Sequence, residues 1–131
     1  MKILIVEDTP DRQELLRRLL AGHDIVVVDS AEAAVGKLRG TAFDLVFLDY
    51  DLAGEGTGGD VASFLTTVDA APEVVVHSMN PEGVAAIRAV LPDAHPVPID
   101  RLHPRTALYS RLRAGFAAHQ PIGWSDIEER I

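Results

Sequence analysis

The chain has 131 residues, a formal net charge of −8 and no cysteine. This length supports one domain with a single core. The lack of cysteine excludes disulfides, thiolate metal sites and a thiol nucleophile. The acidic balance argues against nucleic-acid binding, which requires clustered Lys and Arg. The apolar runs are too short to span a bilayer and the first residues lack a signal-peptide pattern, so we expect a cytoplasmic protein without membrane contact.

Strand and helix patterns alternate along the chain. Five runs rich in Val, Ile and Leu predict strands at 2–6, 25–28, 45–48, 74–76 and, interrupted by two prolines, 95–99. A helical apolar spacing follows each run, and the last such helix is expected at about 104–119. This alternation predicts an α/β fold, a single three-layer (α/β/α) flavodoxin-like domain whose five parallel strands have the order 2-1-3-4-5. We expect the domain to cover residues 1–120, with a short helix in a tail at 121–131.

Two of the predicted strands end in carboxylates. Glu7 and Asp8 follow the first strand, whereas Asp49 and Asp51 follow the third. In the expected strand order these two ends are neighbours, so the acids should meet in one crevice. Converging carboxylates repel one another unless a cation or a proton lies between them, and oxygen ligands of this kind suit Mg²⁺. Alternatively, Glu7 and Asp8 interact only with the N-terminus of the following helix.

The fourth strand also ends in polar residues, His77 and Ser78. A carboxylate such as Asp49 can act as a nucleophile toward a phosphoryl group, and the Ser78 hydroxyl could hydrogen-bond that group. His77 titrates near neutrality and could serve as a general acid or base. Simpler roles remain open, because Ser78 could cap a turn and His77 could bond a backbone carbonyl.

A glycine-rich loop at 54–59 separates the third strand from its helix. It matches G-x-G-x-x-G, but a dinucleotide fingerprint belongs after the first strand, so nucleotide binding is disfavoured. We expect the backbone at Gly58 in this loop and at Asn80 after the fourth strand to contact a phosphate.

Together, the segment 2–8, the strand that ends in Asp49, the stretch 76–78 and the stretch 97–100 resemble the receiver domain (CheY-like) of two-component response regulators. The resemblance covers nearly the whole chain. It implies that Glu7, Asp8 and Asp49 bind Mg²⁺ and that Asp49 accepts a phosphoryl group from a histidine kinase or phosphotransfer protein. Ser78 would sense the modification and a downstream protein partner would respond. Because no output domain follows in this sequence, we expect a stand-alone receiver.

Two features depart from that family. The family's phosphate-pairing lysine falls on Val97, and Arg101 is the nearest basic residue. Asp51 and the glycines also replace the usual segment after the aspartate. These features, together with the stretch 77–83, are similar to a lysine-lacking, receiver-like branch named for the proposed processing of cyclic phosphates.

Three functions therefore stay open. The first is phosphorelay signalling with Asp49 as the phosphoacceptor. The second is a metal-dependent phosphoesterase that acts on a cyclic phosphate through Asp49, Asp51, His77 and Asn80. The third is a degenerate receiver that serves as a protein-interaction module. Exposed helix faces leave a homodimer open.

Overall fold

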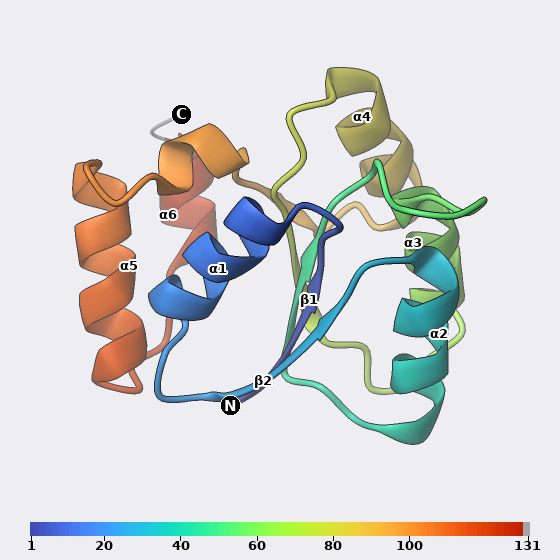
Figure 1. The fold of residues 1–131 in the computed structure, drawn as a ribbon, viewed down its shortest axis with the longest axis horizontal. Helices are drawn as coiled ribbons and strands as arrows, with labels where there is room; N and C mark the ends of the chain where they lie inside the picture. Colours follow the sequence, from blue (N-terminus) through green and yellow to red (C-terminus); the bar gives the residue numbers. More distant parts are fainter. Residues whose placement is uncertain (130–131) are drawn as a thin grey trace.

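The computed structural model describes residues 1–129, which form a parallel sheet between two layers of helices (Figure 1). The elements in chain order are β1 (Lys2–Val6), α1 (Pro10–Leu19), β2 (Asp24–Val28), α2 (Ala31–Gly40), β3 (Leu45–Leu48), α3 (Gly58–Leu65), β4 (Glu73–Val76), α4 (Pro81–Val90), β5 (His95–Pro96), the 3-10 helix η1 (Ile99–Leu102), α5 (Ala107–Ala117) and α6 (Trp124–Glu129). None of the helices within residues 1–129 is long and apolar enough to cross a membrane.

The sheet has the order β2-β1-β3-β4-β5 and every pair in it is parallel. The predicted three-layer, flavodoxin-like fold and its strand order are therefore confirmed. After β2 the chain crosses to the other side of β1 and forms β3, so the carboxyl ends of β1 and β3 lie side by side. This is the position at which ligands bind in open α/β sheets.

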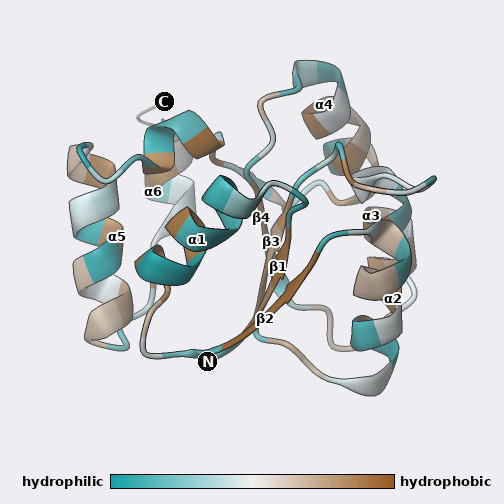
Figure 2. Ribbon diagram, in the orientation of Figure 1, coloured by the Kyte–Doolittle hydropathy of each residue, from teal (hydrophilic) through white to brown (hydrophobic). Residues whose placement is uncertain are grey.

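Each face of the sheet has its own hydrophobic core. Helices α1, α5 and α6 cover one face, where Ile3 and Ile5 of β1 point, and α2, α3 and α4 cover the other, where Leu4 and Val6 point. Figure 2 shows the consequence, since the strands between the two layers are hydrophobic along most of their length. A strand covered on both sides has no polar face, which is why β1 and β3 are uninterrupted apolar runs.

The last strand is shorter than the sequence pattern predicts. Regular pairing ends at Pro96, although the amides of Val97 and Ile99 still donate to the carbonyls of Val76 and His77. Pro96 and Pro98 lack N–H groups and so interrupt the ladder, which is tolerated at the edge of a sheet. The following helix, α5, also begins later than expected, after Thr106, whose hydroxyl accepts from the Tyr109 amide.

The predicted short helix of the tail is α6, and it packs on the sheet. Trp124 and Ile127 are buried in the core beneath α1 and α5. The Trp124 ring lies 6.0 Å from that of Phe47 in the central strand and 6.2 Å from that of Phe116 in α5. Residues 130–131 of the expected tail lie outside the described residues.

Candidate functional site

Four residues continue the sheet by one step at its carboxyl edge, and they form a row across four strands. Their amides extend the parallel ladder: Glu7 donates to Val28, Asp49 to Val6, His77 to Leu48 and Val97 to Val76. Since side chains alternate along a strand, the four side chains point to the same face as Ile5, Phe47 and Val75 two residues earlier. The row thus places two carboxylates and an imidazole next to one another on β1, β3 and β4.

The three polar members of this row are buried and in contact. Glu7 and His77 are each 0% exposed and Asp49 is 3% exposed. The Nε2 atom of His77 lies 2.9 Å from Oε1 of Glu7. One potential ligand atom from each of the three residues lies within 4.8 Å of the other two. Sequence analysis expected His77 near Asp49, but it did not predict the contact between His77 and Glu7, which depends on the alignment of the row.

Burial and mutual repulsion act on the two carboxyl groups in different ways. Burial raises the pKa of Asp49, and the nearby Glu7 charge raises it further, against the lowering effects of His77, the Tyr50 amide and Ser78; the net shift is upward. Burial also acts to raise the pKa of Glu7, but the His77 hydrogen bond, the Thr9 amide and the charges of His77 and Arg12 outweigh it, so this pKa is lowered. Neighbouring groups of the protein therefore stabilise the charged form of Glu7, but they do not offset the burial of Asp49.

An open cleft of about 360 Å³ lies over Asp49 at this edge. Its lining brings together the ends of three strands and consists of Asp8, Thr9, Arg12, Asp49, Asp51, Ser78, Met79 and Asn80. Most of the predicted site residues therefore share one cleft. Glu7 and His77 are buried and are not part of this lining.

Hydrogen bonds fix several groups around the cleft. The Tyr50 amide donates to Oδ1 of Asp49 at 2.8 Å, which orients the carboxylate. The Ser78 hydroxyl accepts from the Asn80 amide at 3.1 Å, and Asn80 Nδ2 lies 3.3 Å from Oδ2 of Asp51. Asp51 is exposed, whereas Asp8 is half-buried.

The basic residue of the cleft is Arg12. It sits in the first turn of α1, four residues after Asp8, so the helix returns it to the edge where β1 ends. Arg101, the basic residue nearest to the lysine position, lies in η1 and is not among the residues that line the cleft in the described part of the chain. The position of Arg12 in the first turn of a helix that directly follows Glu7 and Asp8 was the signal that could have identified it.

Gly58 sits below the cleft and packs against backbone. A Cβ atom at this position would lie 2.1 Å from the carbonyl oxygen of Asp49. The Gly58 amide donates to the Tyr50 carbonyl at 2.8 Å. Gly83 has a similar function on α4, where a Cβ atom would lie 2.4 Å from the Tyr50 ring. These two glycines let the segment after Asp49 pack closely against α3 and α4.

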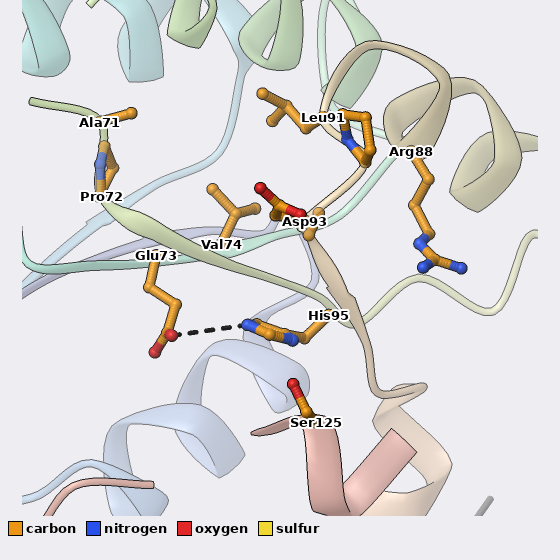
Figure 3. Close-up of a pocket in the computed structure, with 11 residues that line it drawn as sticks. Ala71, Pro72, Glu73, Val74, Arg88, Leu91, Asp93, His95 and Ser125 are labelled. Carbon is orange, nitrogen blue, oxygen red and sulfur yellow. Dashed lines mark ion pairs between the residues drawn. The ribbon is translucent and has the colours of Figure 1, made fainter. Parts of the chain in front are cut away.

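A larger cavity, of about 700 Å³, lies at the opposite edge of the sheet, where β4 and β5 begin (Figure 3). It contains an ion pair between His95 Nε2 and Glu73 Oε2 at 3.5 Å, and Arg88 and Ser125 also line it. The His95 ring stacks on Trp124 at 6.2 Å between centroids. Because Glu73 and His77 lie at opposite ends of β4, this cavity is separate from the acidic cleft.

The fold is that of response regulator receivers. The chain is similar to response regulator Rcp1 in its Mn²⁺-bound form, with a TM-score of 0.66 and 19% identity over 86% of this chain and 89% of that one. It is also similar to TrrA from Thermotoga maritima in complex with Mg²⁺ and BeF, with a TM-score of 0.66 and 22% identity over 90% and 98% of the two chains. A receiver domain from Methanospirillum hungatei gives a TM-score of 0.68 at 16% identity, over 89% and 94%.

Sequence comparison defines the family more narrowly. Residues 2–93 match the model of the cyclic-phosphate processing receiver domain, and the chain belongs to this family of receivers. A segment of 55 residues is 47% identical to the response regulator protein FleR of Pseudomonas aeruginosa. That segment is 40% of this chain but only 12% of FleR, so the chain spans a small part of that relative.

The donor groups at this edge fit a divalent cation. Asp8, Asp49 and Asp51 supply carboxylate oxygens around the open cleft, and Glu7 and His77 lie directly beside Asp49. Burial, with a smaller contribution from the Glu7 charge, raises the pKa of Asp49, so the charged form of this carboxyl would be stabilised by a cation beside it.

Proposed function

We propose that this protein is a phosphorelay receiver in which Asp49 accepts a phosphoryl group with the help of a divalent cation, Mg²⁺ being the expected ion. One observation carries the proposal: Asp49 is a nearly buried carboxylate of raised pKa, held by the Tyr50 amide at the base of an open acidic cleft. A histidine kinase or phosphotransfer protein would be the donor. The cytoplasm, where such donors present their phosphohistidine, is the proposed location.

In the transfer step, a carboxylate oxygen of Asp49 attacks the phosphorus atom of a phosphohistidine. The P–N bond breaks, its electron pair remains on the leaving imidazole, and an acyl phosphate forms on Asp49. Asp8, Asp49 and Asp51 would hold the cation, which supplies positive charge to the transferring oxygens. Arg12 adds a fixed positive charge to the same cleft.

The groups opposite Asp49 would bind and report the phosphoryl group. The Ser78 hydroxyl lies in the cleft lining and can donate to a phosphoryl oxygen once it turns from its contact with Asp49. Its oxygen accepts from the Asn80 amide, which is next to the first residue of α4. A shift of Ser78 would therefore reach α4 and change the surface offered to a downstream partner.

A second function, hydrolysis of a cyclic phosphate, is favoured by the family to which the chain belongs and by the pairing of Asn80 with Asp51 inside the cleft. His77 is less suited to the acid–base role within it. A general acid must reach the reacting group directly or through one water, and His77 is 0% exposed and bonded to Glu7. In this alternative, Asp51 is the better candidate for activating water.

Intact-mass analysis after incubation with acetyl phosphate and Mg²⁺ tests the first proposal. We expect one added phosphoryl group in the wild type and in Asp69→Asn, an exposed control, and none in Asp49→Asn. An unmodified wild type at millimolar donor contradicts the phosphoacceptor role. If cyclic phosphates are then hydrolysed, and Asp51→Asn stops the reaction, the second function replaces it; if neither reaction occurs, the chain acts as an interaction module.

A further inference from the structure

The row formed by Glu7, Asp49 and His77 has an unusual feature for a magnesium site, which is a nitrogen donor fully buried among the carboxylates. His77 is 0% exposed, and its Nδ1 atom has no hydrogen-bond partner among residues 1–129. A buried polar atom without a partner is costly, so its retention requires a reason. The contact of Nε2 with Glu7 and the packing of the ring beside Phe47, at 6.3 Å between centroids, hold the imidazole in place.

The spacing of the three donors is close to that of a metal site. Their potential ligand atoms lie within 4.8 Å of one another. Ligands of Zn²⁺ lie about 2.0–2.2 Å from the ion in a tetrahedral arrangement, so two of them are roughly 3.4 Å apart. Side-chain movements of less than about 1 Å would therefore bring all three donors around one ion.

We propose that Glu7, Asp49 and His77 form a mixed nitrogen and oxygen site that binds a divalent first-row transition metal ion in preference to Mg²⁺. This inference rests on the proposed function only in placing the cation beside Asp49. It changes the identity of the ion, and it replaces Asp8 and Asp51 as ligands by Glu7 and His77. The donor chemistry gives the reason, because imidazole suits transition metal ions, whereas Mg²⁺ prefers oxygen ligands and retains several waters.

Burial and charge favour the same ion. A site that is 0–3% exposed must strip water from the cation, which Mg²⁺ resists. Two carboxylates and a neutral imidazole would balance a divalent ion. The fourth position of the row is Val97, which is buried and carries no charge, so the row itself contains no fixed cation that would compete.

Pulsed EPR of the Mn²⁺-loaded, full-length protein measures His77 ligation without any phosphodonor. We expect a ¹⁴N coupling of directly bound imidazole in the wild type, changed to the ¹⁵N pattern when histidine is ¹⁵N-labelled. In His77→Gln the coupling should vanish, and the ratio of Mn²⁺ to Mg²⁺ affinity, measured by calorimetry, should fall at least tenfold. The exposed His103→Gln variant is the control and should retain both properties.

Absence of a nitrogen coupling in the wild type overturns the inference, and this measurement does not depend on whether any variant folds. An unchanged affinity ratio in a folded His77→Gln variant also overturns it. Labelling by acetyl phosphate with Mg²⁺ distinguishes this failure from that of the proposed function. Labelled Asp49 without a nitrogen coupling supports the receiver function and removes His77 from the metal site. A nitrogen coupling without labelling supports His77 as a ligand and contradicts the phosphoacceptor role of Asp49.

Discussion

Replacement of Gly58 by alanine tests how tightly the backbone is packed beneath Asp49. The new methyl carbon would lie 2.1 Å from the carbonyl oxygen of Asp49 and 2.9 Å from Cα of Tyr50. Both are backbone atoms, so no side-chain rotation relieves the contact. The chain after β3 must move by about 1 Å before the contact becomes ordinary, and such overpacking costs about 1–3 kcal/mol.

Two further effects change this value. The same movement strains the hydrogen bond from the Gly58 amide to the Tyr50 carbonyl, which is worth about 1 kcal/mol. Alanine in place of glycine returns up to about 1 kcal/mol, because the unfolded chain loses less freedom on folding. These two effects nearly cancel, so we expect the free energy of unfolding to fall by about 1–3 kcal/mol.

Urea denaturation followed by circular dichroism measures this change. Gly36→Ala is the matched control, because Gly36 lies inside α2 and no atom is within 4 Å of its added Cβ. The control should gain about 0.5–1 kcal/mol. A Gly58→Ala variant as stable as the wild type would show that the loop is not packed against the Asp49 carbonyl and would refute this reasoning.

Three substitutions probe the buried row and the last helix. Asp49→Asn should raise the urea midpoint at pH 7, because the raised pKa of Asp49 corresponds to a folding penalty that is fully present above its folded pKa. The gain should disappear below about pH 4, and an equal gain at both pH values would contradict this reasoning. The lowered pKa of Glu7 contributes stability that is lost as pH falls through the folded value, so Glu7→Gln should flatten the acid limb of a stability–pH curve, whereas an unchanged limb counts against the Glu7–His77 pair. Trp124→Ala should lower the free energy of unfolding by about 3–5 kcal/mol, and a loss under about 1 kcal/mol would mean that α6 is not part of the core.

Sequence analysis predicted the sheet order and the convergence of Asp8, Asp49 and Asp51 because both depend on a few robust rules. Apolar runs predict buried strands, and acids that follow adjacent parallel strands must meet at one edge. Ser78 follows the fourth strand, which is next to the third, and it lies in the same cleft for the same reason.

The remaining features depend on geometry that residue patterns do not encode. His77 pairs with Glu7 because the ladder continues one residue beyond β1 and β4 and aligns their side chains on one face. Gly58 was expected to contact a phosphate, but its close approach to the Asp49 carbonyl is visible only in three dimensions. The burial of Trp124 likewise depends on α6 folding back onto one face of the sheet, where its ring lies near those of Phe47 and Phe116.

The central claim is that Asp49 itself carries the phosphoryl group. Borohydride reduces an aspartyl phosphate to homoserine, so reduction after treatment with acetyl phosphate and divalent metal, followed by peptide mass spectrometry, locates the modified residue. We expect homoserine at position 49 and unaltered aspartate at positions 8 and 51. Homoserine at position 8 or 51, or none in a folded and metal-loaded protein, would contradict the account.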